Sequence, residues 1–311
     1  MRIDEQEFPC VGEEDLVKAC DALTKAGKGK GTEPDGLVLF HAELEKHQHS
    51  NGKGNGHSET KEDPKDYSTF LNSRPAQLEL DALELILKMC KSYPNIRFHI
   101  VHLSAAEAVP RIKSAREDGI SNLTVETCYH YLTLSSEDIP ANATQYKCCP
   151  PIRSEANRKQ ICQALLEGVI DYVVSDHSPC IPELKKGDFM SAWGGVSGLG
   201  LGLSLLWTEF GKTVDIGRIM SWVSTIQAQQ VGLQGQKGSI AKGMDADLVI
   251  FDPEAEYVVD QVCIHHSLRP WLIDRNTCYS KTRSRHTWAR PLKELLKRPI
   301  YEVNSFGMER K

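Results

Sequence analysis

The residues of this sequence best suited to catalysis or metal binding follow directly behind short apolar runs. Residues 172–174, Tyr-Val-Val, form a β-prone run, and Asp176 and His177 come immediately after it. His41 and His102 end two further apolar runs in the same way. Because the carboxyl ends of parallel strands meet at one edge of a sheet, we expect these side chains to converge. Two imidazoles and a carboxylate suit Zn²⁺, so His41, His102 and Asp176 are predicted to form a metal site.

A single histidine behind a strand is more often a surface residue than a ligand, so this prediction depends on the repetition at three strand ends. His47 and His49 have the spacing of a metal-binding pair, but they follow a polar segment. We interpret them, with His57, as part of a solvated loop. His130 lies just past a fourth expected strand, residues 123–127.

Composition excludes several classes of protein. The chain has 311 residues and 40% hydrophobic content, enough to bury a substantial core. Its ten cysteines are scattered, none in a Cys-x-x-Cys pair, so reduced thiols inside a cell are expected, with cytoplasm, peroxisome and mitochondrion left open. No apolar run approaches the ~20 residues that span a bilayer, and a net charge of −5 does not suggest a nucleic-acid binder. We expect neither a membrane nor a nucleic acid as partner.

Helical and strand-like patterns alternate along the chain. A capping box is expected at Ser104 and Glu107, and the glycines after Trp193 predict a close backbone approach to a ligand or a helix. The alternation predicts an α/β protein with a parallel sheet or barrel. The expected helices are 13–24, 74–93, 104–118, 155–167, 199–210 and 216–229, the expected strands end at His41, His102, Thr127 and Asp176, and two more strands are expected within 237–252.

Several motifs carry a resemblance to a known family. They are, in order, Phe40-His-Ala-Glu43, Ser73-Arg-Pro75 with Glu79, Val101-His-Leu-Ser104, Glu126-Thr-Cys-Tyr-His-Tyr131, Cys149-Pro-Pro-Ile-Arg153, Ser175-Asp-His-Ser-Pro-Cys180, Trp193-Gly-Gly195 and Gly243-Met-Asp-Ala-Asp247. In order and spacing, over about residues 7–253, the chain resembles the cyclic amidohydrolases, which include dihydropyrimidinase, hydantoinase and dihydroorotase. The 175–180 and Ala-Trp-Gly-Gly segments are most similar to the allantoinase branch.

The resemblance implies a fold and a metal site. The expected fold is α/β, the carboxyl-terminal half of a metal-dependent (β/α)8 amidohydrolase barrel with a remnant of a small β-sandwich. The family binds two metal ions, and by resemblance His41, His102 and Asp176 are its ligands at strands five, six and eight. The His-x-His pair, the bridging lysine and strands one to four have no counterpart in this sequence. We therefore expect a truncated chain that holds at most one zinc ion.

The resemblance also implies domains. Residues 1–235 are expected to form the partial barrel, 236–262 the sandwich remnant and 263–311 a divergent tail. From Arg269 onward the chain carries a local charge of +7, and we expect Trp288 in this tail to be little buried.

The implied activity is hydrolysis of a cyclic ureide, the opening of the hydantoin ring of allantoin to allantoate. Asp176 is the expected catalytic residue, and Cys149, Gly194 and Gly195 are expected to bind the substrate, a small molecule. Arg153 is expected to form a structural salt bridge, with assistance in substrate binding as the alternative. The intact family implies a homo-oligomer, while this chain alone is expected to be inactive or impaired. The alternatives are another cyclic amidohydrolase or a non-catalytic dihydropyrimidinase-like protein.

Overall fold

The computed structural model describes residues 11–27, 36–45, 63–249 and 251–255. The chain divides into two compact units, residues 1–197 and 198–311. The predicted histidine pair at His47 and His49, His57, and the tail with Trp288 lie outside the described residues.

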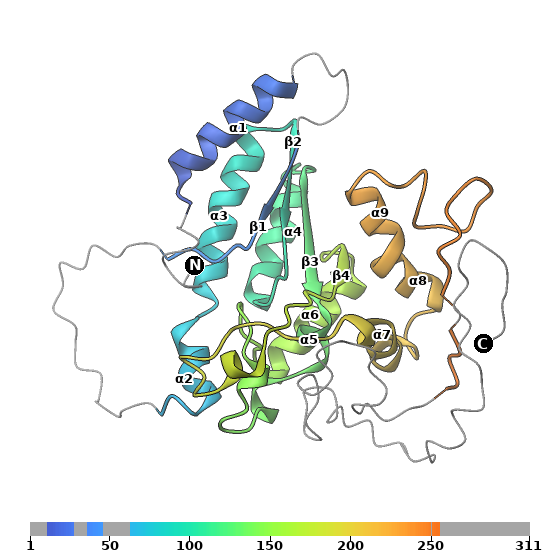
Figure 1. The fold of residues 1–311 in the computed structure, drawn as a ribbon. Coiled ribbons are helices and arrows are strands. Elements are labelled where there is room, and N and C mark those ends of the chain that lie inside the picture. Colours follow the sequence, from blue (N-terminus) through green and yellow to red (C-terminus); the bar gives the residue numbers. More distant parts are fainter. Residues whose placement is uncertain (1–10, 28–35, 46–62, 250, 256–311) are drawn as a thin grey trace. The chain divides into compact units, whose positions relative to one another are not determined.

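A parallel four-stranded sheet forms the centre of the first unit (Figure 1). Its strands are β1 (Gly36–Phe40), β2 (Ile96–Ile100), β3 (Leu123–Cys128) and β4 (Tyr172–Val174), and they lie in the order β1-β2-β3-β4. The register pairs Phe40 with Ile100 and Cys128 with Val174. Chain order and spatial order therefore agree. Strands β1 and β2 end level with each other, as do β3 and β4, whereas β3 continues three residues past Val125, the partner of Ile100.

Helices connect consecutive strands and cover the sheet. Helix α3 buries residues at helical spacing, including Leu83, Ile86 and Leu87, and it packs against β2, whose Phe98 is also fully buried. An apolar stripe of this kind is what holds a helix on a sheet. The helical segments of this unit are α1 (Glu13–Gly27), α2 (Tyr67–Ser73), α3 (Gln77–Ser92), η1 (Ala106–Ala108), α4 (Val109–Glu117), α5 (Tyr129–Thr133), η2 (Ser136–Asp138), η3 (Thr144–Tyr146), α6 (Glu155–Leu166) and η4 (Pro182–Lys185).

The predicted capping box at Ser104 is wrong. The Ser104 hydroxyl donates to the Pro151 carbonyl oxygen at 2.7 Å, and the helical segment begins two residues later with η1. The hydroxyl is therefore occupied by a contact 47 residues away in the chain. A simpler serine N-cap forms at α6, where the Ser154 hydroxyl accepts the Asn157 N–H at 3.2 Å.

The second unit is helical in its described part. It contains η5 (Leu199–Leu201), α7 (Gly202–Phe210), α8 (Ile216–Met220), the π-helical turn η6 (Ser221–Thr225) and α9 (Ile226–Gln230). Phe210 and Trp222 pack edge to face with ring centroids 5.5 Å apart, and Trp222 is 1% exposed. This aromatic pair forms the centre of a small core.

The two strands predicted within residues 237–252 are not formed in the described part of that segment, which runs through turns instead. An isolated two-stranded hairpin is marginal in water, and the described residues of this unit supply no strand for it to pair with. Lys237 instead forms ion pairs with Asp245 and Asp247. The sandwich remnant and the domain boundaries at 235 and 262 therefore remain predictions.

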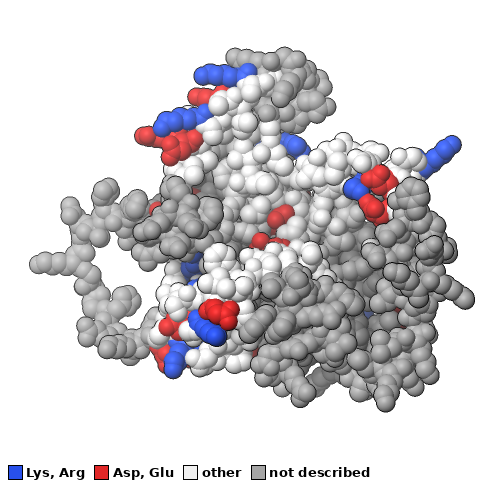
Figure 2. Space-filling view, in the orientation of Figure 1, with Lys and Arg blue, Asp and Glu red and all other residues white. Residues whose placement is uncertain are grey.

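Within the described residues, no helix is both long and apolar enough to pass through a membrane. Figure 2 shows basic and acidic side chains of the described residues interspersed on the face in view, with no extended basic patch there.

Candidate metal-binding active site

The carboxyl ends of β1, β2 and β4 share an unusual backbone conformation. Ala42, His102 and Asp176 have φ values of 57°, 45° and 43°, which place them in the left-handed region. Residues other than glycine seldom adopt this conformation, and such strain gathers at functional sites, where surrounding packing maintains it. At each strand end the chain turns sharply, and this turn aims the side chains around it.

His41 and His102 meet at the ends of the adjacent strands β1 and β2. Their ring centroids lie 4.6 Å apart, with the rings edge to face at 77°. His102 is 7% exposed, and its Nδ1 has no hydrogen-bond partner among the described residues. Burial, together with the neighbouring His41, lowers the pKa of His102 to about 3. His102 is therefore a neutral imidazole, the form in which histidine binds a metal.

A carboxylate and a guanidinium hold His41 from its other side. His41 Nε2 donates to Glu43 Oε2 at 2.6 Å, and the same oxygen accepts a hydrogen bond from Arg74 Nη1. Burial favours the neutral acid at Glu43, but the hydrogen bond from His41 and the charge of Arg74 outweigh it and lower the pKa of Glu43 to about 2. With Nε2 engaged, the Nδ1 atom of His41 is left for a ligand.

Asp176 is the predicted ligand at the end of β4, but among the described residues the ligand atoms that lie within 4.8 Å of one another join it to Cys128 and His130, not to His41 and His102. Burial and the nearby carboxylate of Glu126 raise the pKa of Asp176, while His41 opposes this shift electrostatically. The structure thus brings Asp176 into the same electrostatic neighbourhood as His41. A carboxylate with a raised pKa is better able to accept and return a proton near neutral pH.

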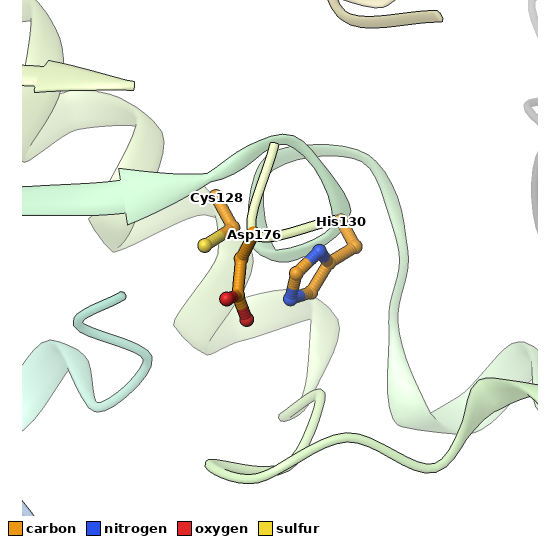
Figure 3. A group of neighbouring side chains, drawn as sticks. All are labelled: Cys128, His130 and Asp176. Atoms are coloured by element: carbon orange, nitrogen blue, oxygen red, sulfur yellow. The ribbon is translucent and has the colours of Figure 1, made fainter. Parts of the chain in front are cut away.

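Two further potential ligands adjoin Asp176. Figure 3 shows the side chains of Cys128, His130 and Asp176 turned toward one another, and one potential ligand atom from each lies within 4.8 Å of the others. Cys128 and His130 are both 0% exposed. Burial lowers the pKa of His130 to about 3 and raises that of the Cys128 thiol. The sequence placed His130 at a strand end, but the residues gave no sign that Cys128 faces the same point.

The residues predicted to bind substrate lie together. A Cβ atom added to Gly194 would stand 3.2 Å from Cys149 Sγ, and one added to Gly195 would stand 2.6 Å from the Ser178 hydroxyl. The backbone of this segment does approach other residues closely, but its neighbours are two loops of the protein and not the predicted ligand or helix. Gly195 N–H also donates to the Lys147 carbonyl oxygen at 2.8 Å. Larger side chains at the two glycines would push these loops apart.

Cys149 lines a pocket near the partner of His41. The pocket has a volume of about 220 Å³, and Glu43, the partner of His41, forms part of its wall. Arg74 and Lys147 add two cationic groups to the wall. Burial lowers the pKa of Lys147 and raises that of Cys149. A small polar molecule in this pocket would lie beside the residues that hold His41.

Arg153 has the structural role predicted for it. Its Nη2 forms a buried ion pair with Glu79 Oε1 at 2.7 Å, and Glu79 Oε2 accepts the backbone N–H groups of Ser104 and Ala105. The pair joins the loop that contains Cys149 to helix α3 and to the turn behind β2. It therefore fixes the loop that is predicted to bind substrate relative to His102.

Taken as donors, the residues at the strand ends fit a metal ion. His102 offers a buried ring nitrogen without a partner among the described residues, His41 offers Nδ1, and Asp176 offers a carboxylate. Imidazole and carboxylate are accepted by zinc and by other divalent first-row ions. A metal ion would supply the partner that the buried Nδ1 atom of His102 lacks among the described residues.

A model of the amidohydrolase family matches residues 37–278. The chain belongs to this family, whose members generally depend on metal ions. The predicted α/β fold class, with part of an amidohydrolase barrel, is thereby confirmed, and the sheet is not closed in the described residues.

Individual relatives are more specific. Over 311 residues the chain is 40% identical to the allantoinase of Saccharomyces cerevisiae, and the match covers 98% of this chain and 62% of that protein. It is 47% identical over 206 residues to a mitochondrial allantoinase of Aquarana catesbeiana, covering 65% of this chain and 39% of that protein. A D-hydantoinase from a Bacillus species matches with a TM-score of 0.64 and 29% identity, over 82% of this chain and 55% of that one. The chain thus spans less than two thirds of these proteins.

Proposed function

We propose that this chain belongs to an enzyme that opens the ring of a cyclic ureide, allantoin, to give allantoate, and that its metal is zinc. The observation that carries the proposal is the meeting of His41 and His102, with ring centroids 4.6 Å apart, at the ends of adjacent strands. The substrate is inferred from the allantoinases that the chain resembles. The alternative substrates, hydantoin and dihydropyrimidines, are suggested by the hydantoinase relative.

In this proposal His41, His102 and Asp176 hold the metal, which supplies Lewis acidity toward the ring carbonyl. The Asp176 carboxylate takes a proton from the attacking water and returns it to the ring nitrogen as the C–N bond breaks. Glu43 holds His41 by its Nε2 atom and leaves Nδ1 directed to the metal.

The substrate would bind along the loop that contains Cys149. Backbone groups of Cys149, together with Gly194 and Gly195, would hold the ring amide, because a glycine there lets the two backbone segments approach each other. The pocket of about 220 Å³ beside Cys149 suits a molecule of one small ring. Lys147 in its wall would attract the anionic product, allantoate, whereas the charge of Arg74 is already compensated by Glu43.

We further propose that residues 1–311 alone lack part of the active site. The segment that would supply the His-x-His pair and the bridging lysine has no counterpart in this sequence, so at most a loosely held ion is expected from His41, His102 and Asp176. The purified chain should then form no allantoate above background. Joined to the amino-terminal half of the yeast allantoinase, it should become active, and Asp176→Asn in that fusion should lower kcat by about 10²–10⁴-fold.

The fusion also tests the substrate. Allantoin, hydantoin and dihydrouracil would be offered in parallel, with zinc content measured on the same samples. A folded, zinc-loaded fusion that hydrolyses hydantoin or dihydrouracil but not allantoin would refute the allantoinase assignment. Zinc-dependent allantoate formation by residues 1–311 alone, abolished by Asp176→Asn, would refute the proposal that the site is incomplete.

Assembly and compartment complete the proposal. A homo-oligomer is inferred from the intact family, and an intracellular compartment from the scattered cysteines. The mitochondrial relative makes the mitochondrion the first compartment to test, by fractionation of cells that express the native gene.

A further inference from the structure

The group of Cys128, His130 and Asp176 contains two residues, Cys128 and His130, that the hydrolytic proposal does not use. Cys128 is the last residue of β3, and His130 follows it in the short helix α5. Because Cys128 pairs with Val174, the final residue of β4, Asp176 leaves the neighbouring strand at the same level. The three side chains therefore converge through strand pairing and not through one local turn, as Figure 3 shows.

His130 is the least satisfied polar side chain of this group. It is 0% exposed, and neither Nδ1 nor Nε2 has a hydrogen-bond partner among the described residues. Buried polar atoms are normally paired, so an imidazole with two free nitrogens indicates a missing partner. One ring nitrogen of His130, the sulfur of Cys128 and a carboxylate oxygen of Asp176 lie within 4.8 Å of one another.

We propose that Cys128, His130 and Asp176 bind a zinc-like divalent ion through one sulfur, one nitrogen and one oxygen atom. Bonds of about 2.0–2.3 Å place neighbouring ligand atoms of a tetrahedral ion about 3.5 Å apart, so a small closure of these side chains would suffice. A thiolate ligand selects zinc or cobalt over magnesium and calcium. Three protein ligands leave the fourth coordination position of a tetrahedral ion open. Of the three ligands, Asp176 is the one that is partly exposed to solvent.

This proposed ion site differs from the predicted site of His41, His102 and Asp176. The two sites have only Asp176 in common. It consists of residues of the carboxyl-terminal half of the barrel only, so it needs nothing from the segment that carries the bridging lysine in the family. An ion there would tie the end of β3 to the end of β4 and would fix the carboxylate of Asp176. Binding does not depend on the proposed hydrolysis of allantoin and is measured without it.

The test uses the full chain, residues 1–311, freed of metal with a chelator and titrated with Co²⁺. Cobalt bound by a thiolate gives a sulfur-to-cobalt charge-transfer band in the near ultraviolet, and four-coordinate cobalt gives strong visible bands. We expect both in the unmodified chain. Cys128→Ser should remove the charge-transfer band. His130→Gln should weaken Co²⁺ binding by about tenfold or more, because losing a ligand should cost at least as much affinity as losing a residue that only orients a ligand.

Two thiols provide matched controls. Cys90 is buried in α3, outside the group, and Cys148 is fully buried and close enough to Cys128 to influence its pKa. Cys90→Ser and Cys148→Ser should both keep the band. If Cys128→Ser does not fold, as judged by circular dichroism, Cys128→Ala takes its place and should likewise lack the charge-transfer band.

The proposal is overturned by cobalt binding without a charge-transfer band, by a band that survives Cys128→Ser, or by the absence of cobalt binding in the folded chain. A band lost in Cys148→Ser but kept in Cys128→Ser would also overturn it, by moving the site to the neighbouring thiol. None of these outcomes tests allantoin hydrolysis. That activity is measured independently, with the fusion protein.

Discussion

A single carboxylate oxygen, Glu43 Oε2, organises one half of the predicted metal site. It accepts from both His41 and Arg74, while Glu43 Oε1 has no partner among the described residues. This arrangement fixes the tautomer and the ring orientation of His41, as outer carboxylates commonly do for metal-binding histidines. Glu43 is therefore a positioning residue whose effect on chemistry passes through His41.

We predict that Glu43→Gln weakens metal binding by about 10–100-fold, because His41 loses a charged partner that orients it. Arg74 would lose its counter-charge in a buried position, so the free energy of unfolding should also fall, by about 1–3 kcal/mol. Zinc competition titration and urea unfolding of the metal-free chain measure the two effects separately.

Glu45→Gln is the matched control for this change. Glu45 lies two residues further along the same segment and is exposed, so its neutralisation should alter neither quantity appreciably. An unchanged metal affinity in Glu43→Gln would mean that Glu43 serves only to hold Arg74.

At the scale of elements, the loop of residues 147–153 is held by one buried ion pair. Arg153 and Glu79 are 9% and 3% exposed, and both are tied to further backbone groups. Breaking a buried pair leaves an uncompensated charge, which costs far more than losing an exposed pair.

We predict that Arg153→Met lowers the free energy of unfolding by about 3–5 kcal/mol, because Glu79 would remain buried without its partner. The control is Arg111→Met, whose partner Glu84 is 52% exposed and whose loss should cost less than about 1 kcal/mol. Equal costs for the two variants in urea unfolding would contradict the buried-pair interpretation of this loop.

At the scale of the whole molecule, the open sheet has two edge strands among the described residues, β1 and β4. Strand β1 carries Leu39, which is 60% exposed. A sheet edge with an exposed apolar side chain favours pairing with another chain. Residues 1–311 are therefore expected to self-associate when they are purified alone.

We predict that Leu39→Lys reduces this self-association, because a lysine on an edge strand opposes pairing with another edge. Ile240→Lys is the control: Ile240 is 91% exposed and lies in the second unit, outside the sheet. Sedimentation velocity over a range of concentrations compares the three proteins. Association that disappears in Ile240→Lys but persists in Leu39→Lys would locate the contact elsewhere.

Much of the fold follows from local pattern. Alternating strand and helix periods predicted the α/β class, and the residue type at each strand end singled out His41, His102 and Asp176 before their positions were known. This works because side-chain period and strand-terminal residues are properties of neighbouring positions in the chain. Parallel pairing then places all strand ends at one edge, whatever the strand order.

Other features depended on contacts between distant residues. The sequence suggested a cap at Ser104, but its hydroxyl binds Pro151, and no local signal pairs Glu43 with Arg74, 31 positions away. The predicted strands near residue 240 lacked a described strand to pair with. A hydrogen bond or hairpin forms only if the rest of the fold supplies its partner, and local propensity does not contain that information.

The group of Cys128, His130 and Asp176 is another feature that depends on contacts between residues distant in the chain. Residue types alone made His130 one strand-end histidine among several, and Cys128 one of ten scattered cysteines. The register of β3 against β4 brought the three together, and the left-handed backbone at Asp176 aimed its carboxylate. Sequence determined which groups were available for chemistry, and tertiary structure decided which share a site, because adjacency of strand ends depends on strand order and register.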